Sequence, residues 1–204
     1  MKNLFIFGTN STGKEILEVA NQFYKNYFNS IQALFFHDNK AKDLDQLNLK
    51  LDHQNYYIVG FSDVELRKKC CNFLDNLSLK PFTIINESSY LSPSCKIGAG
   101  CYIAANASIS SDAKLGDHCI VNLNSSIGHD ASIGKNVLIL PGARISGYCV
   151  INENTLIGSN SFIFQGVTVG KNNSIDALTY IRKDLDDDMI SVSSPTKSLK
   201  KIQS

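Results

Sequence analysis

The sequence predicts a small α/β domain over residues 1–84, followed by a parallel β-helix over residues 85–204. In the first part, strand-like and helix-like segments alternate. In the second, an aliphatic residue stands at every sixth position, seventeen times from Ile85 to Ile181. A period of six fits neither the helical repeat of about 3.6 residues nor simple strand alternation. It is typical of a solenoid whose short strands are joined by tight corners.

The first domain begins with a short buried strand at Lys2–Phe7, and a glycine turn then leads into a helix from Lys14 to about Tyr27. The other expected elements are strands at Ile31–Phe36, Tyr56–Val59 and Phe82–Ile85 and a helix at Asp63–Leu77. Strands that alternate with helices indicate a small parallel sheet. Ligands of such sheets bind beyond the carboxyl ends of the strands.

The glycine turn, Gly8 to Gly13, fits the G-x-x-x-x-G-K pattern of nucleotide hydrolases but is followed by Glu15 instead of the Ser or Thr that holds magnesium. Two interpretations stay open. The turn could receive a phosphate through free amides at the start of a helix, or its glycines could serve only a tight strand-to-helix connection. The acidic Asp38 follows the second strand, where such a residue commonly meets the ribose or base of a nucleotide; with Asn39 it could equally form a turn.

In the solenoid, three hexapeptides make one triangular turn, so residues eighteen apart stack at the strand spacing of roughly 4.8 Å. A small residue follows each aliphatic one by four positions in almost every repeat, and four of the six cysteines occupy that inward place: Cys95, Cys101, Cys119 and Cys149. A buried thiol there is a compact apolar filler. Because no pair has C-x-x-C spacing, we expect neither disulfides nor a metal site.

One corner combines the residues that acid–base chemistry needs. His129 stands at an outward corner and is followed by Asp130, and one turn above it, eighteen residues on, comes Gly147 and then Gln165. A missing side chain above the imidazole would leave a slot with an accessible backbone amide. An imidazole and an amide so placed could act as general base and oxyanion donor. His129 could also be a plain exposed corner residue, which is our expectation for His118.

The repeats, the segment Asn122 to Gly134, Pro141-Gly142-Ala143 and the tail Ser194-Pro195-Thr196-Lys197 together resemble the hexapeptide acyltransferases. With its small Rossmann-like domain before a left-handed parallel β-helix, the chain most resembles the sugar-nucleotide 4-amino N-acetyltransferases and the related sialic acid O-acetyltransferases. The resemblance extends over nearly the whole chain.

That resemblance implies a role for each matching residue. His129 would be the general base, Asp130 would support it, Asn122 would line the active site and Gly147 would offer its amide to the thioester carbonyl. Acetyl-coenzyme A would lie between neighbouring solenoids of a homotrimer, and the nucleotide sugar would bind the first domain. The implied coenzyme contacts are Gly147, Ser159, Gln165, Gly166, Pro195 and Lys197, and the implied sugar-nucleotide contacts are Gly8, Asn10, Ser11, Thr12, Asp38 and Asn39.

The chain departs from these relatives at Thr12, where many of them carry histidine, and at Leu138, where some of them do. It also departs from them at the corner residues Asp176 and Leu178.

Alternatives to amino-sugar N-acetylation for surface-glycan biosynthesis are O-acetylation of a sialic acid and a non-catalytic scaffold that binds a sugar nucleotide. A β-helix carbonic anhydrase would need three histidines, and the solenoid holds only two.

The overall composition favours a soluble protein without nucleic-acid or membrane partners, since the net charge is +1 and 43% of residues are hydrophobic. The apolar run at the amino terminus is too short for a signal peptide. We therefore expect a cytoplasmic protein.

Overall fold

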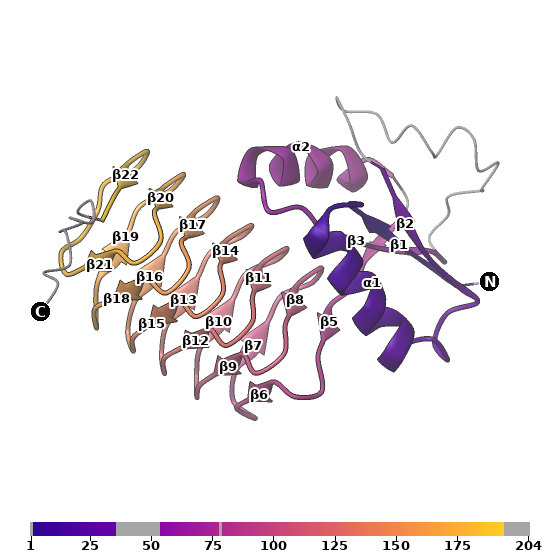
Figure 1. Ribbon diagram of the computed structural model, residues 1–204, viewed down its shortest axis with the longest axis horizontal. Helices are drawn as coiled ribbons and strands as arrows, with labels where there is room; N and C mark the ends of the chain where they lie inside the picture. The colour runs from indigo at the N-terminus through magenta and orange to yellow at the C-terminus, as the bar shows by residue number, and fades with distance from the viewer. Residues whose placement is uncertain (1, 36–53, 78, 194–204) are drawn as a thin grey trace, which may run out of the picture.

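The computed structural model describes residues 2–35, 54–77 and 79–193. An α/β domain forms one end, and the coils of a solenoid step away from it (Figure 1). The fold class expected from the sequence is confirmed.

The first domain contains a parallel sheet with the strand order β2-β1-β3-β4. Its elements are β1 (Asn3–Phe7), α1 (Ser11–Phe23), β2 (Ser30–Leu34), β3 (Tyr56–Val59), α2 (Val64–Asp75) and β4 (Lys80–Pro81). Side chains alternate along β1: Leu4 and Ile6 pack in the core formed with α1, whereas Phe5 and Phe7 pack in the core formed with α2. The two helices therefore cover opposite faces of the sheet.

The expected fourth strand at Phe82–Ile85 is wrong. The sheet ends with β4, and Ile84–Ile85 instead form β5, which pairs with the next coil of the solenoid through Tyr102 and Ile103. Ile85 already carries the six-residue register, so it joins the ladder of the solenoid. Pro81 suits the edge of the sheet because it has no N–H to donate.

The solenoid has three faces, each a parallel sheet of two-residue strands. Face one contains β5 (Ile84–Ile85), β8 (Tyr102–Ile103), β11 (Ile120–Val121), β14 (Leu138–Ile139), β17 (Leu156–Ile157), β20 (Ser174–Ile175) and β22 (Ile190–Ser191). Face two contains β6 (Tyr90–Leu91), β9 (Ser108–Ile109), β12 (Ser126–Ile127), β15 (Arg144–Ile145), β18 (Phe162–Ile163) and β21 (Tyr180–Ile181). Face three contains β7 (Lys96–Ile97), β10 (Lys114–Leu115), β13 (Ser132–Ile133), β16 (Val150–Ile151) and β19 (Thr168–Val169). We number each corner after the face that precedes it.

The aliphatic positions fill the interior as expected, and the small residues lie beside them in one continuous core. All six cysteines are free, and the four in the solenoid pack in or against this core. Burial raises the pKa of Cys149, so its thiol stays neutral and serves as filler.

Acidic side chains close the last coil of the solenoid. The backbone N–H groups of Thr168 and Lys171 donate to the carboxylates of Asp184 (2.8 Å) and Asp187 (2.6 Å). The segment that follows pairs with this coil only in part, for example through the Leu185 carbonyl, which accepts from the Gly170 N–H at 2.9 Å. The acidic run therefore satisfies the terminal donors.

The two domains share a buried interface at face one. Tyr102, Ile120 and Leu138 point outward from this face and are buried in the same cluster as α1. The Tyr102 hydroxyl donates to Glu15 of α1 at 2.8 Å. The α/β domain is thus packed directly on the first coils of the solenoid.

A second junction is built around Arg67 of α2, which is fully buried. Its guanidinium donates to the carbonyls of Val59 (2.6 Å) and Phe61 (3.1 Å) in its own domain. Across the junction it donates to the carbonyl of His118 (2.5 Å) and to Asn136 Oδ1 (3.1 Å) at the third corner. Burial lowers the pKa of Arg67 because the cation loses its hydration.

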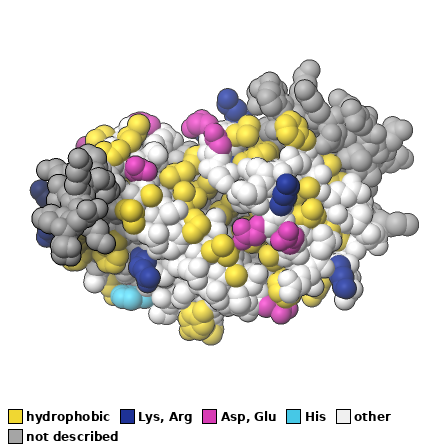
Figure 2. All heavy atoms as spheres, in the orientation of Figure 1, with side chains coloured by type: hydrophobic (Ala, Val, Ile, Leu, Met, Phe, Trp, Pro, Cys, Tyr) yellow, Lys and Arg dark blue, Asp and Glu magenta, His cyan; other side chains and the backbone are white. Residues whose placement is uncertain are grey.

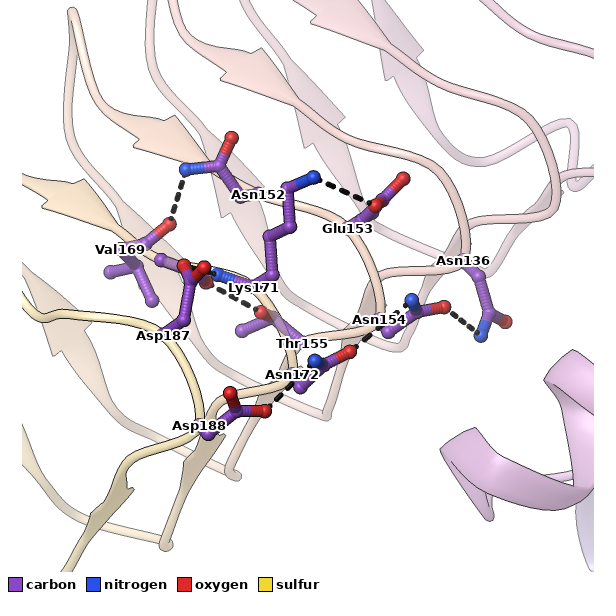
Figure 3. A network of polar contacts seen from close by, with 11 residues as sticks. Asn136, Asn152, Glu153, Asn154, Thr155, Val169, Lys171, Asn172, Asp187 and Asp188 are labelled. Carbon is purple, nitrogen blue, oxygen red and sulfur yellow. Dashed lines mark hydrogen bonds and ion pairs between the residues drawn. The ribbon is translucent and has the colours of Figure 1, made fainter.

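An asparagine ladder continues from this arginine along the third corner (Figure 3). Asn136 Nδ2 donates to Asn154 Oδ1 (3.0 Å), Asn154 Nδ2 to Asn172 Oδ1 (3.3 Å), and Asn172 Nδ2 to Asp188 Oδ1 (2.8 Å). Every amide in the ladder has the same orientation, with the cation at one end and a carboxylate at the other. All four ladder residues have φ between 55° and 61°, a left-handed conformation that Asn and Asp tolerate best among side-chain-bearing residues.

Candidate active site

The second corner brings the predicted catalytic group together. Its stacked columns place Gly147 above His129 and Tyr148 above Asp130, and the Tyr148 N–H donates to the His129 carbonyl at 2.9 Å. One coil higher, the Gly166 N–H donates to the Gly147 carbonyl at 3.0 Å. The eighteen-residue stacking inferred from the sequence is therefore present at this corner.

His129 and Asp130 form a hydrogen-bonded pair, with 2.9 Å between Nδ1 and Oδ2. Their side chains are 49% and 42% exposed, so ligands can reach them. The carboxylate accepts from Nδ1–H, which leaves the lone pair on Nε2. In that tautomer the imidazole can remove a proton through Nε2.

The imidazole packs directly against the backbone of Gly147. A β-carbon on Gly147 would lie 2.7 Å from His129 Nε2 and 2.8 Å from its Cε1. The open slot expected above the imidazole is therefore absent, because the ring itself occupies the space that the missing side chain leaves. Glycine is needed here so that the ring can lie flat against the next coil.

The backbone N–H of Gly147 is a candidate oxyanion donor. At the equivalent position of the hexapeptide at the third and first corners, Asp117 and Asn122 accept from the N–H groups of Ala99 (2.8 Å) and Leu123 (2.7 Å). Within the described residues, nothing accepts a hydrogen bond from the Gly147 N–H. The same residue packs on the imidazole, since a β-carbon on Gly147 would lie 2.7 Å from Nε2. The amide is thus close to the place where negative charge would develop on a reacting carbonyl.

The column above Gly147 is exposed. Gln165 lies one coil above Gly147, and Lys183 lies one coil above Gln165. Lys183 borders a cleft of about 460 Å³, which is also lined by Tyr180, Ile181, Arg182 and Leu185. A β-carbon on Gly166 would meet nothing within 4 Å. The corner therefore leads from the imidazole along uncovered backbone to two basic side chains.

Asn122 and Ser159 lie elsewhere, at the first corner. The Asn122 side chain accepts from the Leu123 N–H. The structure does not bring Asn122 to His129 within one chain, and Leu138 is fully buried at the domain interface. The roles of Asn122 in the active site and of Ser159 in coenzyme binding stay predictions.

The glycine turn of the α/β domain has a tightly packed backbone. A β-carbon on Gly13 would lie 2.0 Å from the Gly8 carbonyl oxygen, so no side chain fits there. The Asn10 side chain caps α1 by accepting from the Gly13 N–H at 3.1 Å, and Thr12 Oγ1 is hydrogen-bonded to Ser62 Oγ at 2.7 Å. Ser11 is exposed at the first turn of α1. These contacts support a structural use of the turn and leave its proposed role in binding untested.

The expectation that His118 is a surface residue is wrong, since it is only 3% exposed and stacks on Tyr57 with ring centroids 5.8 Å apart. The α/β domain covers this part of the third corner. The predicted contacts Asp38, Asn39, Pro195 and Lys197 lie outside the described residues.

Within the described part of the chain, no cluster of three or more potential metal ligands occurs. None of the described helices has the length and apolar character that crossing a membrane would require. The face drawn in Figure 2 mixes acidic, basic and apolar side chains without a broad patch of one charge.

Two protein families match parts of the solenoid. Residues 130–165 match the family "Bacterial transferase hexapeptide (six repeats)", and residues 148–183 match "Hexapeptide repeat of succinyl-transferase". Both matches lie in the solenoid, which therefore carries the hexapeptide repeat of these families. A comparison of the chain with curated proteins gave no match.

Solved structures resemble this chain over nearly its whole length. The acetyltransferase domain of PglB from Neisseria gonorrhoeae FA1090, also solved in complex with acetyl coenzyme A, is 26% identical; the match covers 97% of this chain and 99% of that domain, with a TM-score of 0.82. PerB from Caulobacter crescentus, solved with CoA and GDP-perosamine, is 21% identical over 96% of each chain, with a TM-score of 0.81. WeeI from Acinetobacter baumannii AYE is 20% identical over 98% of this chain and 100% of that one, with a TM-score of 0.84. PerB and WeeI share the fold.

Sequence reasoning missed Tyr148, Arg182 and Lys183. Counting upward by eighteen from His129 reaches Lys183 in three steps, so the same register could have found this residue and its neighbour Arg182. No comparable signal marks Tyr148, because its significance depends on contact with the imidazole.

Proposed function

We propose that this transferase moves an acetyl group from acetyl-coenzyme A to the 4-amino group of a nucleotide-linked 4-amino-4,6-dideoxy sugar. One observation carries the proposal: the imidazole of His129 is hydrogen-bonded to Asp130 through Nδ1, and its ring packs where a side chain on Gly147 would lie. The solenoid that carries this arrangement matches a bacterial transferase hexapeptide family. The chain also resembles an acetyltransferase domain that was solved with acetyl coenzyme A.

The reaction needs no covalent enzyme intermediate. The amine nitrogen of the sugar attacks the thioester carbonyl carbon, and His129 Nε2 takes a proton from that nitrogen. The Gly147 N–H donates to the carbonyl oxygen as it becomes negative. The carbon–sulfur bond then breaks, the amide forms, and the thiolate of coenzyme A leaves and takes the proton from the His129 imidazolium, which restores the neutral imidazole. Asp130 stabilises the imidazolium that exists between these steps.

The coenzyme would extend upward from His129 along the second corner. The exposed backbone at Gly166 suits its narrow pantetheine arm, with Gln165 as a polar neighbour. Arg182 and Lys183, at the cleft two coils above Gly147, would neutralise its phosphates. The coenzyme is a substrate here, and the protein contributes its position and the stabilisation of charge.

The sugar nucleotide would bind at the glycine turn of the α/β domain, with Asp38 near its nucleoside.

Asn122 and Ser159 lie at the first corner, so they would join His129 only from a neighbouring subunit. A homotrimer, as the family resemblance implies, would place a first corner beside a second corner. Light scattering tests the assembly, and a stable monomer at assay concentrations would contradict it. The cytoplasmic location is part of this proposal.

A substrate screen tests the proposal. The purified protein would be incubated with acetyl-coenzyme A and UDP-, dTDP- or GDP-linked 4-amino-4,6-dideoxy sugars, with thiol release as the readout. We expect release with one amino sugar and none with the matched 4-hydroxy sugar, together with a product whose mass shows that one acetyl group has replaced one hydrogen. Thiol release only with hydroxyl acceptors would contradict the proposal and favour O-acetylation of a sugar such as a sialic acid. Coenzyme binding without transfer to any acceptor would favour the non-catalytic scaffold.

A further inference from the structure

Tyr148 is an unusual residue for its backbone conformation. It has φ 60°, in the left-handed region. Most side-chain-bearing residues with positive φ in the described solenoid are Asn or Asp, and the exceptions are His118, Tyr148 and Leu178. Bulky side chains are disfavoured in this conformation. A tyrosine therefore strains a corner that asparagine would occupy easily.

The strained residue contacts the proposed general base. The Tyr148 ring meets the His129 imidazole edge-to-face, with centroids 5.0 Å apart and an interplanar angle of 89°. The Tyr148 backbone also donates to the His129 carbonyl at 2.9 Å. Strained backbone that persists beside reacting groups commonly serves to position them.

The imidazole needs such a restraint because it is half exposed. Asp130 holds Nδ1, and the Gly147 backbone limits the ring on the side of Nε2. Neither contact prevents the ring from swinging outward into solvent. The Tyr148 ring contacts the imidazole in addition to these two groups and restricts that swing.

We propose that Tyr148 is a positioning residue for His129. Its ring keeps the imidazole in the rotamer that joins Nδ1 to Asp130 and places Nε2 against Gly147. The proposal rests on the proposed function of His129 as general base. It assigns the strain at Tyr148 to catalysis, and it requires the aromatic ring but not the hydroxyl.

Three variants test this assignment. Tyr148→Asn removes the ring and also the backbone strain, whereas Tyr148→Phe keeps both. Leu178→Asn is the matched control, because Leu178 has φ 59° at another corner and is 71% exposed. We expect both Asn variants to have a Tm at or above that of the parent protein.

Turnover should separate the two sites. Tyr148→Asn should lower kcat roughly three- to tenfold, the range typical of one lost aromatic contact, with an unchanged KM for acetyl-coenzyme A. Tyr148→Phe and Leu178→Asn should turn over at the parent rate. A parent-like kcat in Tyr148→Asn would overturn the proposal. A change of oligomeric state in that variant would also overturn it, in favour of a subunit contact.

Nitrogen-15 NMR of the imidazole supplies a readout that needs no substrate, with His129→Gln used to assign the signals. In the parent and Tyr148→Phe we expect a dominant Nδ1–H tautomer at neutral pH, and in Tyr148→Asn a mixture closer to free histidine. Unchanged imidazole signals in Tyr148→Asn would contradict the positioning role even if kcat fell. If no acetyl transfer occurs at all, the proposed function fails, and these signals still decide whether Tyr148 orients His129.

Discussion

The second and third corners of the solenoid are made by the same repeat yet differ in what their side chains do. At the third corner, Asn136, Asn154 and Asn172 stack in one column and bond to one another. At the second corner the equivalent column runs from Asp130 to Tyr148 to Gly166, and the column beside it runs from His129 to Gly147 to Gln165, so neither column repeats a residue. A repeated residue at a corner stabilises the fold, whereas a break in the repetition leaves groups available to a ligand.

The two corners also differ in their surroundings. The α/β domain covers part of the third corner and inserts Arg67 beneath the asparagine ladder. The second corner faces away from that contact, and His129 remains half exposed. Substitutions at the second corner should therefore change catalysis with little effect on stability, and those at the third corner should do the reverse.

The largest expected effect is that of His129→Ala. It should lower kcat by about 10²–10⁴-fold, the usual contribution of a general base, with acetyl-coenzyme A binding and Tm close to those of the parent. Steady-state kinetics and calorimetric coenzyme binding would measure this. Near-normal turnover would remove His129 from the mechanism, and a large loss of Tm would remove the distinction between the corners.

At the third corner, Arg67→Met should destabilise the fold by about 3 kcal/mol, because several buried carbonyls would lose their donor. Denaturant unfolding followed by circular dichroism would report the free energy of unfolding. Methionine keeps much of the side-chain volume, so the change isolates the polar contacts. A variant as stable as the parent would show that these hydrogen bonds add nothing to domain docking.

Gly147→Ala should lower kcat by about 10²-fold, since its β-carbon would displace the imidazole and a misplacement of about 1 Å has that effect. Tm should change little, because the group that must move is an exposed side chain. Comparing kcat with Tm for this variant tests the stacking of the two coils. Full activity would mean that Nε2 does not work from the position seen against Gly147.

The smallest effect concerns one rung of the ladder. Asn154→Gly should destabilise by about 1–2 kcal/mol through two lost hydrogen bonds, while glycine tolerates the left-handed backbone. Asn124→Gly is the matched control, because Asn124 has a similar φ of 57° and an exposed side chain at the first corner. Equal unfolding free energies for the two variants would refute a stabilising role for the ladder.

Much of the site could be predicted by counting residues. Vertical neighbours in a solenoid are set by a fixed period, so the positions of His129, Asp130 and Gly147 in one corner followed from their numbers alone. Counting could not show that the imidazole fills the space above it, because that depends on a rotamer. It also could not place Asn122 beside His129, because the two residues lie at different corners of the solenoid.

The solenoid, its inward residues and its corners follow from the amino-acid pattern, because a strict period of six leaves one way to bury the aliphatic side chains. The junction between the repeat and the α/β domain became visible only in the folded chain. There β4 takes Lys80–Pro81 while Ile84 joins the solenoid, His118 is buried against Tyr57, and Arg67 bonds to the third corner. These contacts depend on how two separately patterned surfaces fit together, and neither pattern contains that information.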